Sequence, residues 1–353
     1  MRRRRLSGMA RYATGSGALL LAAAVAAAGA GAGAAVRPAE LRISGAVDQP
    51  LRLRLADLQR LPHHAVQLSE VHRDGSFHGT MRYRGASLRQ VLELARLGKS
   101  AGAFRKPTDL AIAVRDRRGR SVLLSWGEVF YSDPGRFILA TDWTPVRPHK
   151  ACSRCHQPAE ARPRLEQLQR RVALPKLVPS GVIYGDRAVE PVAAIAVVEP
   201  RPAPPAPKRN ARQRLYAAEV RLEGVGVAAR TFDALPADLP RRELTAVRTG
   251  EGTGFHGLRH YSGVRLRVLL EAAGFAFHPQ RAVVLSAPDG YQVLVSAGEL
   301  YAPGGDRILL ADRCGGRPLA DGGRFQLVLA GDLHADRWLQ AVERIEVVEW
   351  PAP

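Results

Sequence analysis

The sequence predicts an α+β protein built from two tandem copies of one domain, each mostly β with a few helices. Three observations support this fold class: a long internal repeat, short apolar runs bounded by glycine, aspartate and proline, and one amphipathic helical pattern in each copy. The chain has 353 residues, which is long for a single domain and sufficient for two, each with its own core.

The internal repeat covers most of the chain. The aligned segments are 41–62 with 219–240, 77–97 with 255–275, 110–131 with 282–302, and 186–200 with 336–350. The first two pairs are separated by 178 positions, and the order of the segments is the same in both copies. We therefore expect both copies to share one fold.

Each copy combines several strand patterns with one helix pattern. Runs such as 282–287 and 325–331 are apolar or alternate with polar residues and are bounded by turn residues, which is typical of strands. Leucine recurs at positions i, i+3 and i+4 in 86–98 and 264–275. This spacing predicts one amphipathic helix in each copy.

The domain boundaries follow from the repeat and from changes in composition. We expect a signal peptide at 1–36, a first domain at 37–200, a Pro-rich linker at 201–214 and a second domain at 215–353. The first domain carries about 21 residues that the second lacks, and this insertion lies at 149–171. Surface loops tolerate insertions of this size and are common places for function.

The N-terminus is typical of an exported protein. Four arginines at positions 2–5 precede an uncharged stretch, 13–36, which is rich in alanine and ends in small residues. This pattern predicts a cleaved secretory signal, a periplasmic location and no stable membrane span after cleavage. An uncleaved membrane anchor is the alternative reading of the same stretch.

The net charge is strongly basic. The formal charge is +19, and about +14 remains without the five arginines of residues 1–36. Few aromatic residues accompany the arginines, so a nucleic-acid partner is not expected for an exported chain. The excess of arginine is typical of a solvated basic surface, and it also suits an acidic redox partner or an anionic membrane surface.

Cys152, Cys155 and His156 form a C-x-x-C-H motif inside the insertion. In c-type haem attachment, two thiols bond the vinyl groups and the adjacent histidine binds the iron, which requires this contiguous spacing. The chain has only three cysteines, so the motif is unlikely to arise by chance. The sequence therefore predicts one covalently bound haem c, with His156 as the proximal ligand.

Two other readings of the motif stay open. A zinc site would need two further ligands, which Cys314 and a remote histidine could supply. A disulfide or redox dithiol between Cys152 and Cys155 is the other reading, although the nearby prolines do not favour the helix that lowers the first thiol's pKa in such motifs.

The distal ligand of the predicted haem has several candidates. His149, His72 and His78 belong to the same copy as the motif. Met81 is the single methionine after residue 36, which makes a His/Met pair less favoured than a bis-histidine or five-coordinate iron. The axial ligand sets the reduction potential, so the sequence does not predict that potential.

The order of short motifs resembles the molybdopterin-binding domain of the sulfite oxidase family. In the first copy the motifs are G-x-V-x-x-P at Gly45–Pro50, D-L-x-x-L-P at Asp57–Pro62 and Y-x-G-x-x-L from Tyr83. In the second copy Y-x-G-x-x-L begins at Tyr261, and D-G-Y, I-L-L-A and D-R-W follow it. The resemblance implies two sulfite-oxidase-type domains and a molybdopterin cofactor.

The chain departs from this family at the metal ligand. The resemblance implies a cysteine thiolate in segments 65–85 and 243–263, and neither segment contains cysteine. Histidine, arginine and serine do not replace a soft thiolate on molybdenum. We therefore expect the catalytic molybdenum to be lost, and molybdopterin is disfavoured as a cofactor. His78 and His256 recur there in F-H-G, which is read as a turn or as a ligand position.

These observations predict an exported redox protein that carries one haem c and acts in electron transfer. One alternative is a molybdopterin-dependent oxidoreductase that passes electrons to the haem. Another is a non-catalytic binding module stiffened by a zinc or disulfide clip. No catalytic residue is assigned, and whether the protein is an enzyme stays open.

Overall fold

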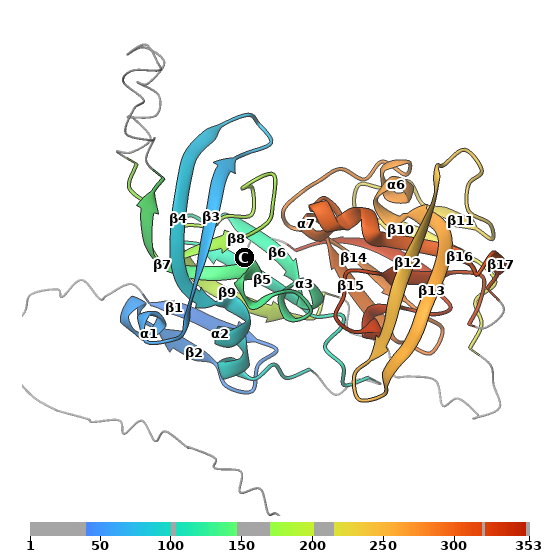
Figure 1. Cartoon of the computed structure of the whole chain (residues 1–353), viewed down its shortest axis with the longest axis horizontal. Helices are drawn as coiled ribbons and strands as arrows, with labels where there is room; N and C mark the ends of the chain where they lie inside the picture. The colour runs from blue at the N-terminus through green and yellow to red at the C-terminus, as the bar shows by residue number, and fades with distance from the viewer. Residues whose placement is uncertain (1–39, 100–103, 147–169, 201–214, 320–321, 351–353) are drawn as a thin grey trace, which may run out of the picture. The chain divides into compact units, whose positions relative to one another are not determined.

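The computed structural model describes most of the chain after its first 39 residues (Figure 1). The described residues are 40–99, 104–146, 170–200, 215–319 and 322–350. They belong to one compact unit, Pro38–Pro353. The expected signal peptide, the Pro-rich linker and the C-x-x-C-H motif lie outside the described residues.

The elements follow the same order in the two halves of the chain. The first half contains β1 Leu41–Gly45, β2 Leu51–Leu53, α1 Leu55–Gln59, β3 His63–Val71, β4 Phe77–Ser87, α2 Leu88–Ala95, β5 Ala111–Asp116, β6 Ser121–Ser125, α3 Trp126–Phe130, β7 Phe137–Pro145, β8 Lys176–Pro179 and β9 Val192–Val198. The second half contains β10 Val220–Gly224, β11 Arg230–Phe232, β12 Arg241–Gly250, β13 Gly254–Arg265, α6 Leu266–Glu271, β14 Arg281–Ser286, β15 Gln292–Ser296, α7 Ala297–Leu300, β16 Ile308–Cys314, β17 Arg317–Pro318, β18 Gln326–Leu329 and β19 Arg344–Glu349.

Strand pairing also repeats between the halves. One sheet has the order β2-β1-β9-β5-β6, and its counterpart has the order β11-β10-β19-β14-β15. The pairs β1–β9 and β10–β19 are parallel, while their neighbours are antiparallel. The other two sheets are β3-β4-β7-β8 and β12-β13-β16, where β16 also pairs with β17 and β18. The sequence repeat therefore has a counterpart in the pairing of the strands.

The predicted fold class, an α+β protein of two tandem sulfite-oxidase-type domains, is wrong. Of the described residues, 46% lie in strands and 15% in helices, and the four sheets have a propeller-like arrangement. The five described α-helices are four to eight residues long, too short to form a helical layer. The expected predominance of strands with a few helices is confirmed, and what the arrangement of the sheets overturns is the assignment of two tandem sulfite-oxidase-type domains.

The predicted amphipathic helices are present but short. α2 buries Leu88, Val91 and Leu92 and ends before Arg96, whose φ of 51° is a left-handed conformation that a helix does not continue. Its counterpart α6 is followed by Gly274, whose φ is 100°. The leucine pattern extends beyond these points. It therefore predicts the buried face of each helix correctly but overestimates the length of the helix.

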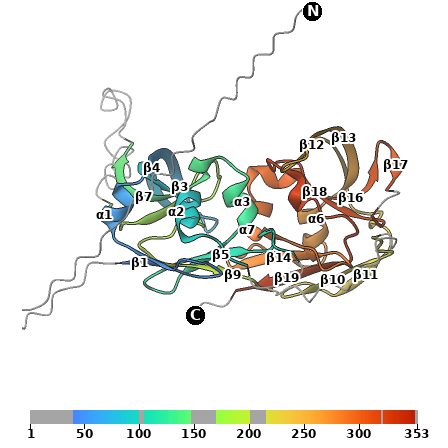
Figure 2. The same cartoon turned by 90° about the horizontal axis from the view of Figure 1, so that it is seen from below.

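The hydrophobic cores lie between the sheets of each half. Figure 2 shows strands β1, β5, β9, β14, β19, β10 and β11 along one side and the β3–β4 and β12–β13 hairpins on the other, with α2, α3, α6 and α7 between them. Leu92, Ile112 and Leu139 belong to the main core of the first half, and Leu270, Val283 and Leu310 belong to that of the second. Burial of such side chains stabilises each half by about 2 kcal/mol per residue.

The two halves meet through the edges of two sheets. The Leu123 N–H donates to the Pro279 carbonyl over 2.7 Å, and the Leu294 N–H donates to the Thr108 carbonyl over 2.9 Å. A cluster of small and aliphatic side chains from β5, β6, β14, β15 and β19 is buried there. Both halves therefore bury this surface against each other.

Both copies contain the motif S-x-G-E, at Ser125–Glu128 and Ser296–Glu299, which caps a helix and links the halves. Ser125 and Ser296 each accept a hydrogen bond from the backbone N–H three residues later. The Ser125 hydroxyl also donates to Glu299 over 2.7 Å, and the Ser296 hydroxyl donates to Glu128 over 2.6 Å. Each serine thus serves its own helix and the carboxylate of the other half.

Two buried arginines complete this junction. Arg187 pairs with Glu128 over 2.7 Å, and Arg337 pairs with Glu299 over 2.6 Å. The guanidinium of Arg337 lies against Gly127 of the first half, where an added Cβ would overlap it. Arg187 lies against Gly298 of the second half in the same way. The glycine of S-x-G-E is therefore required by the close approach of an arginine.

Among the described residues, no helix has both the length and the apolar character needed to cross a membrane.

Candidate functional site

A β-bulge at the end of the β3–β4 hairpin places His78. Ser69 pairs with Thr80 and Val71 pairs with Phe77, so the two residues His78 and Gly79 stand opposite one residue of β3. Gly79 has a φ of 106°, which glycine adopts without strain. Bulges redirect side chains, and this one brings His78 beside β3. F-H-G is thus a bulge within a hairpin.

Glu70, the β3 residue opposite the bulge, is a buried carboxylate held by cations. Its side chain is 3% exposed, and Lys176, which is fully buried, contacts Oε2 over 2.6 Å. Arg170 donates to the same oxygen over 2.8 Å, and Tyr83 lies within 3.5 Å of it. Glu190 contacts both Lys176 and Arg170, so two carboxylates balance two cations.

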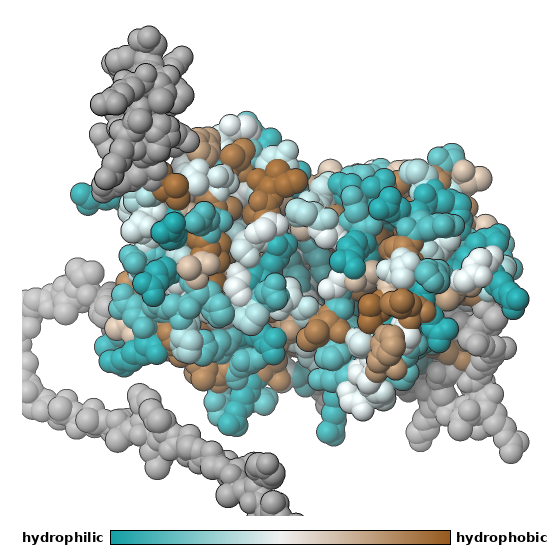
Figure 3. All heavy atoms as spheres, viewed as in Figure 1, coloured by the Kyte–Doolittle hydropathy of each residue, from teal (hydrophilic) through white to brown (hydrophobic). Residues whose placement is uncertain are grey.

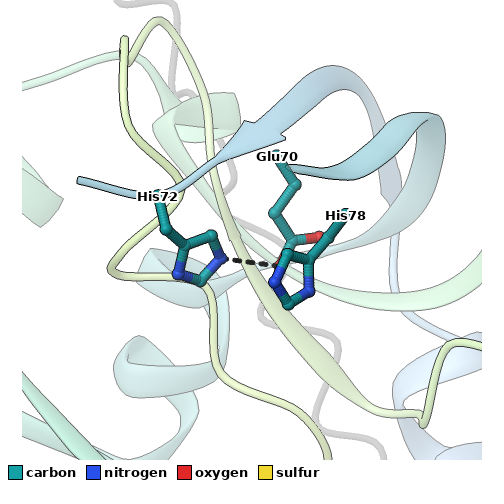
Figure 4. Close-up of side chains that lie close together, drawn as sticks. All are labelled: Glu70, His72 and His78. Atoms are coloured by element: carbon teal, nitrogen blue, oxygen red, sulfur yellow. Dashed lines mark ion pairs between the residues drawn. The ribbon is translucent and has the colours of Figure 1, made fainter. Parts of the chain in front are cut away.

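Two histidines lie next to this network (Figure 4). The imidazole rings of His72 and His78 stack with centroids 4.6 Å apart. His72 Nε2 lies 3.6 Å from Glu70 Oε1, and its Nδ1 lies 3.8 Å from Asp186. His72 Nε2 is buried without a hydrogen-bond partner among the described residues. Candidate ligand atoms of Glu70, His72 and His78 all lie within 4.8 Å of one another.

The electrostatics keep Glu70 ionised and His78 neutral. Burial raises the pKa of Glu70, but Lys176 and Arg170 outweigh it and lower that pKa to about 2. Burial lowers the pKa of His78, and the nearby charges of His72 and Arg170 lower it further. A neutral imidazole has a free nitrogen lone pair, the form that binds metals.

The described residues on either side of the C-x-x-C-H segment contact β4 at His78 and Thr80. The Val146 N–H, at the end of β7, donates to the Thr80 carbonyl over 2.9 Å. Arg170 donates to the His78 carbonyl over 3.0 Å. The residues between Val146 and Arg170 include the C-x-x-C-H motif. The chain therefore leaves the sheet two residues from His78, and the first described side chain after the motif reaches the His78 carbonyl.

Exposed apolar side chains surround this position. Phe77 precedes His78, and Val146 is bonded to Thr80; their exposed fractions are 45% and 41%. Ile183 and Tyr184, in a loop that contacts β3 through Gly185, are also exposed. Figure 3 shows apolar surface beside the end of the β3–β4 hairpin.

The second half has the same bulge without the charged cluster. Val247 pairs with Leu258 and Thr249 with Phe255, so His256 and Gly257 stand opposite Arg248, the counterpart of Glu70. There, His256 contacts the Thr253 hydroxyl over 2.9 Å. In place of His72 and Lys176 the second half has glycine and glutamine. The cluster therefore occurs in the half that carries the insertion.

The structure brings together only part of the predicted ligand set. His72 and His78 stack, whereas Cys152, Cys155, His156 and His149 lie outside the described residues. Met81 is 1% exposed, and its side chain packs in the core with Val66 and Leu68. Cys314, the third cysteine, is half-buried on β16 in the other half.

Sequence reasoning missed the charged residues of the site. Glu70 occupies an inward position of β3, and Lys176 begins the apolar run of β8. A charge at a position that the strand pattern assigns to the core is a signal of a buried ion pair. That signal was present, but it does not reveal which distant charge is the partner.

Acid should weaken the contribution of Glu70 to stability. Its pKa is about 2 in the folded protein against an ordinary 4.5, so its ion pairs stabilise the fold above pH 4.5 and are lost as the pH falls toward 2. This pKa difference corresponds to about 3 kcal/mol. In urea titrations, the stability gap between wild type and Glu70→Gln should shrink from pH 6 to pH 3. A gap independent of pH would contradict the assignment.

Comparison with known proteins does not identify a family for this chain. No protein-family model matches the chain, and no curated protein matches it. Among solved structures, the chain is similar to the sulfane dehydrogenase SoxCD from Paracoccus pantotrophus, with 13% identity and a TM-score of 0.32. The alignment covers 88% of this chain and 78% of that one. A similarity of this strength defines neither the family nor the activity of this chain.

Proposed function

We propose that this chain is an exported electron-transfer protein with one covalent haem c attached through Cys152 and Cys155. His156 is the proximal ligand, and His78 or its stacked neighbour His72 is the distal ligand. The observation that carries the proposal is that the described residues on either side of the C-x-x-C-H segment contact β4 at and beside His78. When bound, haem supplies an iron that carries one electron between its ferrous and ferric states.

The described residues fit such a group. His72 and His78 supply imidazole nitrogens, including one buried nitrogen without a partner among the described residues. The exposed apolar side chains nearby would shield a porphyrin from water. Arg170 and Lys176 are balanced by Glu70 and Glu190 together, so these four groups hold no unbalanced charge.

The exposed arginines of β4 support an acidic redox partner. Arg82 and Arg84 are exposed on the strand that carries His78. Complementary charge raises the rate at which redox proteins meet. This electrostatic effect weakens as the ionic strength rises. Molybdopterin has no part in the proposal, since the hairpins β3–β4 and β12–β13 contain no cysteine.

Haem attachment is the first test. The protein, expressed with its export signal in a host that matures c-type cytochromes, should give a pyridine haemochrome spectrum and a mass increase of one haem. Cys152→Ala with Cys155→Ala should abolish both signals and leave the fold intact by circular dichroism. Cys314→Ala is the matched control and should change neither. A wild-type protein without covalent haem would overturn the proposal.

The distal ligand is the second test. Replacing His78 or His72 by alanine should convert low-spin haem to a high-spin or altered spectrum, because the sixth ligand is lost. His256→Ala, at the same bulge of the second half, should leave the spectrum unchanged. If neither first-half variant changes the spectrum, the pair is not an axial ligand, while covalent attachment can still hold.

A zinc site is the second candidate, favoured by the short distance between the two imidazoles. Cys152 and Cys155 together with His72 and His78 would form the Cys₂His₂ set of a closed tetrahedral zinc site. Metal analysis of the exported protein separates the two functions. One equivalent of zinc without a haem spectrum would support zinc, and haem without zinc would support the cytochrome.

A further inference from the structure

The turn of the β3–β4 hairpin brings Arg73 into contact with the second half of the chain. Arg73 follows His72 directly, and its guanidinium lies 4.2 Å from the centre of the Phe277 ring and 5.2 Å from that of Tyr301. Tyr184 of the first half lies against the same guanidinium at 4.5 Å. These three rings form an aromatic clamp on Arg73. The residue next to His72 is thus held by both halves.

The aromatic clamp leaves Arg73 little freedom. The cavity around it has a volume of about 20 Å³, which is room for about one water molecule. The rings of Phe277 and Tyr301 pack edge to face, with centroids 5.5 Å apart. The side chain of Arg73 is 33% exposed. At such sites a cation on an aromatic face contributes about 0.5 to 1 kcal/mol. The clamp therefore positions Arg73 more than it stabilises the fold.

Asp186 connects the clamped arginine to His72. Its Oδ1 accepts from the backbone N–H of Arg73 over 3.0 Å, and its Oδ2 lies 3.2 Å from the Nε of the same arginine. Oδ1 also faces Nδ1 of His72, at 3.8 Å. A carboxylate beside one imidazole nitrogen orients the ring and leaves the other nitrogen for a metal. That other nitrogen, Nε2, is buried without a hydrogen-bond partner among the described residues.

The loop that carries Tyr184 and Asp186 is fixed on β3. The Gly185 N–H donates to the Val71 carbonyl over 2.7 Å. A Cβ on Gly185 would come within 2.9 Å of the Glu70 side chain, so a larger residue would displace that side chain. β3 thus holds the carboxylate, and the aromatic clamp holds the guanidinium.

We propose that the second half of the chain is a positioning element for the histidine pair and acts through Arg73 and Asp186. Its two rings hold the guanidinium, the guanidinium holds the carboxylate, and the carboxylate orients His72, which stacks on His78. The inference rests on the proposed function for what the pair ligates, but the orientation of the pair does not require haem. A carboxylate behind an axial imidazole tunes a haem iron, so the packing of the halves would influence the reduction potential.

Lys106 provides a matched contact elsewhere between the halves. Its ammonium lies 2.5 Å from the carboxylate of Asp336, and 46% of its side chain is exposed. Its other ion-pair partner among the described residues is Glu251, at 3.9 Å, so this contact does not lead to the histidine pair. Lys106→Gln therefore removes a cation that joins the halves, as Arg73→Gln does, without touching the proposed route.

Nuclear magnetic resonance of the exported protein, labelled at histidine, tests the orientation without haem. The parent carries Cys152→Ala and Cys155→Ala, which remove the thiols that haem attachment needs. The parent should show a nuclear Overhauser effect between the rings of His72 and His78, because their centroids are 4.6 Å apart.

Two variants of this parent should lose that effect. Arg73→Gln removes the cation from the clamp and from Asp186, and Phe277→Leu removes one ring face of the second half. Lys106→Gln should keep the effect. In the haem-loaded protein with its cysteines intact, the first two variants should shift the reduction potential and the low-spin spectrum, and Lys106→Gln should change neither.

Two outcomes in variants that are folded by circular dichroism would overturn the proposal. One is an unchanged effect between the two rings in either Arg73→Gln or Phe277→Leu, which would remove the second half from the positioning of His72. The other is an equal loss in Lys106→Gln, which would indicate a general loosening of the halves. A protein without covalent haem would refute the proposed function and leave the resonance experiment decisive for this inference.

Discussion

Replacing Glu70 by alanine is expected to lower the free energy of unfolding by about 3 to 5 kcal/mol. Glu70 and Lys176 are 2% and 0% exposed, and their charged atoms lie 2.6 Å apart. Without the carboxylate, Lys176 and Arg170 would share Glu190 alone, leaving a buried positive charge uncompensated. Urea denaturation followed by circular dichroism at neutral pH measures the loss.

The double variant Glu70→Leu with Lys176→Met is the control for this prediction. It removes both charges and keeps apolar volume, so much of the lost stability should return. Arg170 can then pair with Glu190 alone, over 2.6 Å. A single variant that loses under about 1 kcal/mol would show that solvent reaches Lys176, because exposed pairs contribute only that much.

Replacing Gly127 by alanine should destabilise the junction of the halves by about 3 kcal/mol or more. The new Cβ would overlap the guanidinium of Arg337, a fully buried side chain held by Glu299 and Asp332. Arg337 cannot retreat without breaking those ion pairs. Gly298→Ala should act in the same way through Arg187. Thermal unfolding monitored by calorimetry would show a lower melting temperature for both variants.

Gly304→Ala is the matched control for the glycine prediction. Gly304 lies in the 3₁₀ turn near α7, and an added Cβ there would have no heavy atom within 4 Å. Its φ is not in the left-handed region, so alanine should change stability by less than about 0.5 kcal/mol. If Gly127→Ala were equally harmless, Arg337 would not be confined as the structure shows.

Local sequence patterns predicted much of the secondary structure and strand pairing, although the predicted fold class was wrong. The repeat anticipated equivalent strand pairing, and the leucine spacing identified the buried faces of α2 and α6. The S-x-G-E motif was visible in both copies as a sequence identity. Its reason was not visible, because the arginine that requires Gly127 lies more than 200 residues away. The fold class failed in its arrangement of two tandem sulfite-oxidase-type domains, because how the four sheets are arranged depends on contacts between distant strands.

The candidate site likewise has residues that the sequence pointed to and residues that it did not. His72 and His78 were named because they belong to the same copy as the C-x-x-C-H motif, and His78 also recurs in F-H-G. Their stacking depends on a bulge, and a bulge needs a partner strand whose register no single segment specifies. Glu70 and Lys176 were missed because a buried charge is interpretable only together with its partner.

The sequence by itself determined that the chain is repeated, that one copy alone has a C-x-x-C-H insertion, and where the apolar faces lie. These properties depend on residue type and spacing along the chain. Only the tertiary structure decided that Val146 and Arg170, on either side of the C-x-x-C-H motif, contact Thr80 and His78, that Lys176 pairs with Glu70, and that each half confines an arginine of the other. Such contacts join distant residues, and their energies depend on burial and on distances of a few ångströms, which spacing along the chain does not encode.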